Sequence, residues 1–184
     1  GTLFAVGLIW LRVELTERLY YVFLIWNLFL AWLPWWLSLA IARWGRSLPL
    51  PGLLLLGGVW LLLLPNAPYI VTDFIHLVPR PPAPLWLDTA MLAVSSWTGC
   101  ILGFWSLQMV QDVLSERFGV RLGWLVAWGS LALSSLGIYL GRVERWNSWD
   151  IVERPLDIVR DGLVIFLHPR SHALASFGVV AGAV

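Results

Sequence analysis

Two ionisable side chains that can act together follow an apolar segment broken by prolines. Asp73 and His76 are three residues apart, a spacing that places both on one face of a helix. A carboxylate and an imidazole so placed can move protons as an acid–base pair or chelate a divalent metal ion. With Asp88 and Asp150 they form a set of one imidazole and three carboxylates that suits Zn, Mn or Mg. One interpretation is therefore a metal-dependent enzyme, although no HExxH or repeated His pattern accompanies these residues.

Further polar residues are expected near Asp73 and His76, at the same membrane interface. Helical geometry puts Asn66 and Tyr69 within about 80° of Asp73 and His76 around the axis. The expected binding residues are Asn66, Tyr69, Arg142, Arg145, Trp146, Asn147 and Trp149. Planar guanidinium groups bind phosphate in a bidentate manner and Trp prefers the membrane interface, so Arg142, Arg145 and Arg154 with these Trp residues can hold a lipid head group.

A structural interpretation of the same acids is favoured over the enzymatic one, and the two can coexist. Asp73 and Asp88 are expected to pair with Arg142 and Arg145 and so to tie three helix ends together. Such pairs would neutralise the carboxylates without any ligand.

Two prolines interrupt the apolar segment that carries Asn66. Pro65 and Pro68 each remove a backbone donor, and Pro68 can occupy the first turn of a restarted helix with Asn66 as its N-cap. The Asn66 side chain is then expected to satisfy carbonyl groups that the prolines leave without a partner.

The composition identifies a membrane protein. The chain has 184 residues, of which 59% are hydrophobic and 12% charged, whereas soluble domains carry about 25% charged residues. The formal net charge is +1, and the basic residues are all Arg, so no cationic tail is available for nucleic acid. Cys100 is the single cysteine and can form no disulfide within the chain.

Apolar runs of spanning length predict an all-α polytopic bundle of five to six transmembrane helices in one domain. The expected spans are residues 3–12 (partial), 19–42, 52–78, 86–110, 122–141 and 173–184 (partial), with residues 111–121 as a connection. The partial spans reach the termini, which suggests that the sequence is part of a longer chain. An amphipathic pattern over residues 155–167 predicts one interfacial helix.

Alternation of the spans assigns each connection to a side of the membrane. Eight of the twelve Arg fall on the side that carries Asp73, Asp88 and Asp150, which by the positive-inside rule favours a cytoplasmic location for this polar face.

The expected membrane core contains Asn27, Asn66 and Gln108 but no Asp, Glu, Arg or His at mid-span. This argues against a proton relay or an ion-coupled transporter, because such proteins place ionisable groups there. His76 could ligate a single tetrapyrrole, whereas His168 and His172 lie in a polar loop.

Several Trp residues lie deep in the expected spans, where an indole N–H needs a partner. They are Trp32, Trp60, Trp97, Trp105 and Trp128. They can line a carotenoid or quinone, face other subunits, or fill space in the bundle, and the last is favoured. The small-residue series Ser95, Gly99, Gly103 and Ser130, Ser134, Gly137, Gly141 predict close helix contacts.

Two motifs also resemble a known family. They are PNAPYIVTD (residues 65–73), followed by His76, Trp86 and Asp88, and RWNSWD (residues 145–150). The chain from about residue 19 onward resembles a bacterial family of multi-pass membrane proteins defined as domain of unknown function thirteen sixty-one. The resemblance implies six or seven spans, a location in a bacterial inner or internal membrane, and no particular activity.

These observations predict a non-catalytic accessory or assembly subunit of a larger membrane complex, with membrane lipids and other membrane subunits as partners. The alternative is a membrane-embedded hydrolase or transferase that acts on a lipid head group, with Asp73 and His76 as the catalytic pair.

Overall fold

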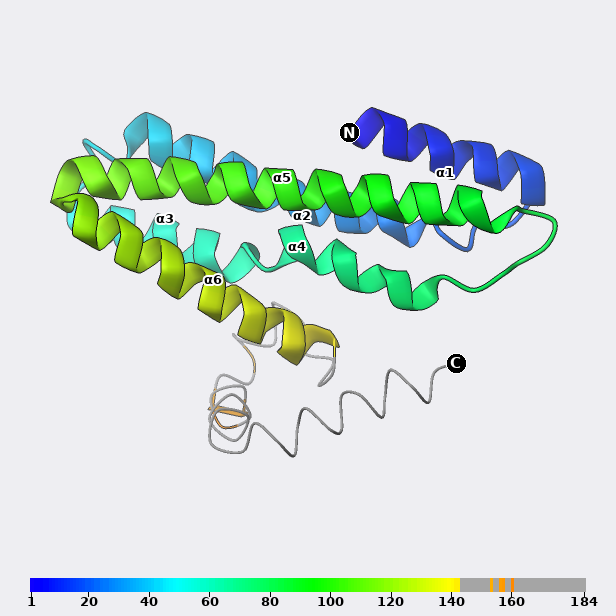
Figure 1. Cartoon of the computed structure of the whole chain (residues 1–184). Helices are drawn as coiled ribbons and strands as arrows, with labels where there is room; N and C mark the ends of the chain where they lie inside the picture. The colour runs from blue at the N-terminus through cyan, green and yellow to red at the C-terminus, as the bar shows by residue number, and fades with distance from the viewer. Residues whose placement is uncertain (143–152, 154–155, 158–159, 161–184) are drawn as a thin grey trace. The chain divides into compact units, whose positions relative to one another are not determined.

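The computed structural model describes residues 1–142, 153, 156–157 and 160. In this part of the chain every regular element is a helix, which confirms the all-α prediction. The elements are α1 (Thr2–Thr16), α2 (Phe23–Trp44), α3 (Leu50–Leu63), α4 (Asn66–Tyr69), the 3₁₀-helix η1 (Ile70–His76), α5 (Leu85–Phe118) and α6 (Val120–Arg142), drawn in Figure 1. The chain divides into two compact units, Gly1–Ser134 and Ser135–Val184.

Four described helical segments are long and apolar enough to cross a membrane, so the protein is a multi-pass membrane protein. They are α2, the segment Leu50–His76 that joins α3, α4 and η1, then α5 and α6. This number is slightly below the predicted five to six, because α1 has 15 residues where a span needs about 20. The predicted partial span over residues 173–184 lies outside the described residues. Of the predicted interfacial helix, Leu156, Asp157 and Arg160 are described, and they are helical.

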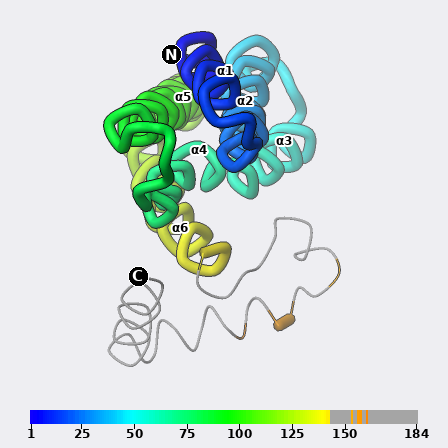
Figure 2. The backbone as a smooth tube through the Cα atoms, turned by 90° about the vertical axis from the view of Figure 1, so that its right-hand side faces the viewer, coloured from blue at the N-terminus to red at the C-terminus, as the bar shows by residue number. Residues whose placement is uncertain are grey.

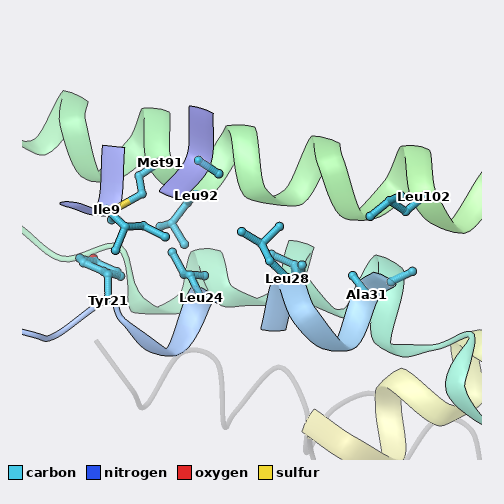
Figure 3. Close-up of a cluster of buried hydrophobic side chains, with 11 residues drawn as sticks. Ile9, Tyr21, Leu24, Leu28, Ala31, Met91, Leu92 and Leu102 are labelled. Carbon is cyan, nitrogen blue, oxygen red and sulfur yellow. The ribbon is translucent and has the colours of Figure 1, made fainter. Parts of the chain in front are cut away.

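Helices α2 and α5 form the centre of the unit Gly1–Ser134. Helix α1 packs against α5, and both α4 and η1 pack against α2 and α5. Figure 2 views these helices nearly end-on and shows them side by side. Apolar side chains of α1, α2 and α5 point toward one another in a shared core (Figure 3), in which Ile9, Leu24 and Leu92 are almost fully buried.

Helix α5 extends beyond its apolar run. The residues predicted to connect two spans, 111–121, are helical as far as Phe118, and the chain turns at Gly119, whose φ is +98°. Gln111, Glu116 and Arg117 are good helix formers, so loss of apolar character does not end the helix. Arg117 Nη1 donates hydrogen bonds to the carbonyls of Gly45 and Leu48 at 2.6 and 2.8 Å, which fixes this end of α5 to the connection after α2.

Pro65 and Pro68 break the segment Leu50–His76 as expected, but the local structure differs from the prediction. Asn66 is the first residue of α4 rather than its N-cap, which is Pro65. The Asn66 Nδ2 group donates to the Leu63 carbonyl at 3.0 Å. In a continuous helix that carbonyl would bind the amide of Ala67, which instead donates to Leu64 at 3.1 Å. The role of Asn66 as a partner for a freed carbonyl is therefore confirmed.

The segment after Pro68 is also wound differently from the prediction. The chain continues as the 3₁₀-helix η1 instead of an α-helix. Because a 3₁₀-helix has three residues per turn, Asp73 and His76 lie one above the other on it.

Small residues allow α4 to touch α5. A Cβ atom on Gly99 would overlap the backbone carbonyl oxygen of Ala67, and one on Gly103 would lie 3.2 Å from the Ala67 Cβ. The predicted close helix contact is confirmed at Gly99 and Gly103, as a contact within the chain. This contact sets the position of α4 and therefore of η1, which carries the candidate site residues.

Candidate functional site

A buried ion pair joins α1 to the first turn of α5. Arg12 Nε lies 2.6 Å from Asp88 Oδ1, and Arg12 Nη2 lies 3.5 Å from Asp88 Oδ2. The two side chains are 2% and 0% exposed. The carboxylate also lies near the N-terminus of α5, where the helix dipole favours negative charge. Asp88 therefore carries a structural charge that its own chain neutralises.

This pairing corrects the sequence analysis, which assigned Asp88 to Arg142 or Arg145. The alternation of the expected spans puts Arg12 on the same side of the membrane as Asp88, but no partner is predicted for it. One feature of the sequence could have indicated this pair. Arg12 is the first ionisable residue of the chain and follows the N-terminal apolar run directly, so it is expected on the same helix. An Arg at that place needs a buried acid, and Asp88 opens a helix on the same side.

Asp73 joins η1 to α2. Asn27 Nδ2 donates to Asp73 Oδ2 at 2.7 Å, and Asp73 is 1% exposed. Asn27 is one of the polar residues expected in the membrane core, but its partner was not predicted. The contact places the carboxylate of the expected catalytic pair against α2.

Tyr21, in the connection between α1 and α2, lies between the ion pair and η1. Its hydroxyl donates to the His76 carbonyl at 2.9 Å, and the Arg12 guanidinium lies 4.7 Å from the centroid of its ring. The His76 imidazole packs edge-on against Phe23, with 5.3 Å between ring centroids. Burial, followed by the nearby Asp88 carboxylate, raises the pKa of Tyr21 above its ordinary value of 10.0.

The raised pKa of Tyr21 predicts a loss of stability at high pH. Unfolded Tyr21 ionises near pH 10 while the folded phenol keeps its proton, so the free energy of unfolding falls as pH rises from 10 through the folded pKa. Tyr21→Phe removes this dependence and costs about 1 kcal/mol at neutral pH through the lost hydrogen bond. Thermal unfolding between pH 8 and 11 measures both effects. Tyr20→Phe is the matched control and should keep the loss at high pH; equal pH dependence of Tyr21→Phe and the parent would contradict the assignment.

The expected metal ligands are only partly brought together. Among the described residues, no group of three His, Cys, Asp or Glu side chains is placed to hold a metal ion. Asp88 contacts Arg12, Asp73 contacts Asn27, and Asp150 lies outside the described residues. The metal site with Asp73, His76, Asp88 and Asp150 stays a prediction.

The other expected binding residues are described in part. Tyr69 ends α4, and its carbonyl accepts a hydrogen bond from Thr72 Oγ1 at 2.6 Å; Arg142 ends α6. Arg145, Trp146, Asn147, Trp149, Arg154, His168 and His172 lie outside the described residues. The lipid site predicted on this group remains a prediction.

A third polar contact joins three helices deeper in the bundle. The Trp60 indole Nε1 donates to Ser106 Oγ at 2.7 Å, and Ser106 Oγ donates to the Pro34 carbonyl at 2.9 Å. These residues belong to α3, α5 and α2, and Trp60 is 2% exposed. Trp60 therefore fills space and satisfies its N–H inside the bundle, as the favoured interpretation predicts. That interpretation is wrong for Trp97, Trp105 and Trp128, which are exposed on the surface.

A family described as protein of unknown function (DUF1361) matches residues 26–183 of the chain. The chain belongs to the DUF1361 family. The match covers both PNAPYIVTD and RWNSWD, the motifs on which the resemblance was based. It also covers Asn27, Asp73 and Asp88, whereas Arg12 and Tyr21 precede it. No curated protein and no solved structure matches the chain significantly.

Proposed function

We propose that this DUF1361 protein is a non-catalytic accessory or assembly subunit of a larger membrane complex. The observation that carries the proposal is that its buried polar groups bind one another across helices. Arg12 with Asp88 joins α1 to α5, Asn27 with Asp73 joins α2 to η1, and the Trp60–Ser106 contact joins α3 to α5. Contacts of this kind fix the positions of the helices. They also occupy Asp73 and Asp88, the carboxylates that an enzyme would need for its substrate.

The exposed aromatic surface of α5 supports a protein partner. Trp97, Phe104 and Trp105 are 69%, 65% and 58% exposed, and their spacing puts them within about 100° of one another around the helix. At about 1.5 Å per residue, Trp97 lies roughly 18 Å from the start of α5, well within a hydrocarbon core of about 30 Å. Lipid tails offer no acceptor for an indole N–H, whereas a neighbouring protein can.

Purification from native membranes in mild detergent tests the proposal. We expect the protein to migrate on a native gel in a band larger than its own mass and to bring the same membrane proteins in constant ratio, identified by mass spectrometry. Trp97→Leu/Trp105→Leu should release those partners, because the aromatic surface is lost while α5 keeps its helix. Trp86→Leu is the matched control, since Trp86 is 66% exposed on the same helix but lies in its first turn.

A lone band at the mass of this chain would overturn the accessory role. The lipid-head-group enzyme with Asp73 and His76 would then be tested next, first by measuring the metal content of the purified parent and of Asp73→Asn. The location that we propose for the complex is a bacterial inner or internal membrane, as the family resemblance implies. The arginine distribution favours an orientation with the polar face toward the cytoplasm.

A further inference from the structure

A small pocket lies at the end of the bundle where α1 finishes. We name it the basic pocket; its lining residues are Arg12, Thr16, Arg18, Tyr20, Arg80 and Pro81. They come from the C-terminal end of α1, the connection to α2, and the loop between η1 and α5, which meet at one end of the unit Gly1–Ser134 in Figure 1. The volume is about 40 Å³, compared with roughly 10–15 Å³ for one water molecule. The basic pocket therefore has room for a group of phosphate size.

The charge of the basic pocket is positive. Its lining contains three guanidinium groups and no carboxylate. Asp88 neutralises Arg12 from the buried side, so the charges of Arg18 and Arg80 remain. Two like charges beside one cavity repel each other, and an anion between them converts that repulsion into attraction.

The Arg80 side chain is held in place but keeps an unused donor. Its guanidinium carbon lies 3.7 Å from the centroid of the Tyr20 ring, and its Nη2 donates to Tyr20 Oη at 2.7 Å. Within the described part of the chain, the buried Arg80 Nε has no hydrogen-bond partner. A buried donor on a charged group is costly to leave unpaired, so the Arg80 guanidinium keeps unused hydrogen-bonding capacity beside the basic pocket.

We propose that the basic pocket binds the phosphate group of an anionic ligand. Arg80 provides a planar guanidinium fixed by Tyr20, Arg18 provides a second charge, and Thr16 provides a hydroxyl. The ligand is either a phospholipid head group, which the position beyond the ends of the spans favours, or a soluble phosphate. This site differs from the lipid site predicted on Arg142, Arg145 and Arg154, and it does not depend on the accessory role.

The test uses the full chain in detergent with two probes. Phosphatidylglycerol binding is measured by native mass spectrometry against zwitterionic phosphatidylcholine, and inorganic phosphate binding by calorimetry. Arg18→Gln/Arg80→Gln should weaken binding of the recognised probe by at least about tenfold, because charge-assisted hydrogen bonds are lost. Arg80→Lys should fall between this variant and the parent, since an ammonium keeps the charge but not the planar fork. Arg43→Gln and Arg121→Gln, at exposed arginines elsewhere, should bind like the parent.

Each outcome has a definite meaning. Weakened phosphatidylglycerol binding identifies a lipid site, and weakened inorganic phosphate binding alone identifies a soluble ligand; both support the proposal. Absence of binding by the parent, or equal binding by the parent and Arg18→Gln/Arg80→Gln, overturns it. If the double variant does not fold, Arg18→Gln decides instead, because Arg18 is exposed and its loss leaves the Tyr20–Arg80 stack intact. That single change should still weaken binding several-fold.

Discussion

Arg12→Gln should destabilise the protein by about 3–5 kcal/mol, because it leaves the Asp88 carboxylate buried without its counter-charge. The effect should be this large because both side chains are at most 2% exposed, so water cannot replace the lost partner. Asp88→Asn should act in the same direction by leaving the Arg12 guanidinium unpaired. The free energy of unfolding in detergent, followed by loss of helical signal, measures both.

Replacing both partners separates the ion pair from simple loss of packing. Arg12→Met/Asp88→Leu should recover much of the stability that each single change removes, because apolar groups of similar volume carry no buried charge. The chain also offers a matched control in Arg46 and Glu116, an ion pair of similar chemistry whose side chains are 51% and 57% exposed. Arg46→Gln should leave stability nearly unchanged, since water solvates the remaining partner. A comparable loss in Arg46→Gln and Arg12→Gln would refute the importance of burial.

The sequence predicts the parts of the fold that depend on local composition. Apolar runs of about 20 residues located four spans, because the length of such a run is set by the membrane. The same rule gives the length of a span but not the end of its helix, and residues 111–118 stay helical because a helix that leaves the membrane needs only good helix formers to continue. It also missed η1, because the choice between α and 3₁₀ winding after Pro68 depends on packing against α2 and α5.

The sequence predicts on which side of the membrane the candidate site residues lie, but it does not predict which residues they contact. Topology correctly placed Asp88 near the start of a helix on the side of Arg12. It could not select Arg12 among the arginines of that side, because the choice depends on which helices are neighbours. Asn27 shows the same limit, since its partner Asp73 is on a different helix and far away in the sequence. Pairings of this kind follow from the three-dimensional arrangement, which composition and periodicity leave open.

The contact between α4 and α5 depends on Gly99, so a larger residue there should displace α4 and, with it, the candidate site residues on η1. In Gly99→Ala the new Cβ would overlap the Ala67 carbonyl oxygen, which is backbone and cannot turn aside as a flexible side chain can. Helix α4 must then move away from α5, which weakens the hydrogen bond from Ser96 Oγ to the Ile70 carbonyl, now 3.2 Å. We expect a loss of about 1–3 kcal/mol in the free energy of unfolding, the usual cost of overpacking.

Gly58→Ala provides the opposite expectation on the same physical grounds. Nothing lies within 4 Å of a Cβ at Gly58, which is exposed in the middle of α3. Alanine should therefore stabilise the protein by about 0.5–1 kcal/mol through its better helix propensity. Since Gly99 is also inside a helix, the same propensity gain acts there, and the difference between the two variants isolates the cost of the contact. If both glycines tolerate alanine equally, α4 does not press on α5 as closely as the structure places it, and Asp73 is not held by that contact.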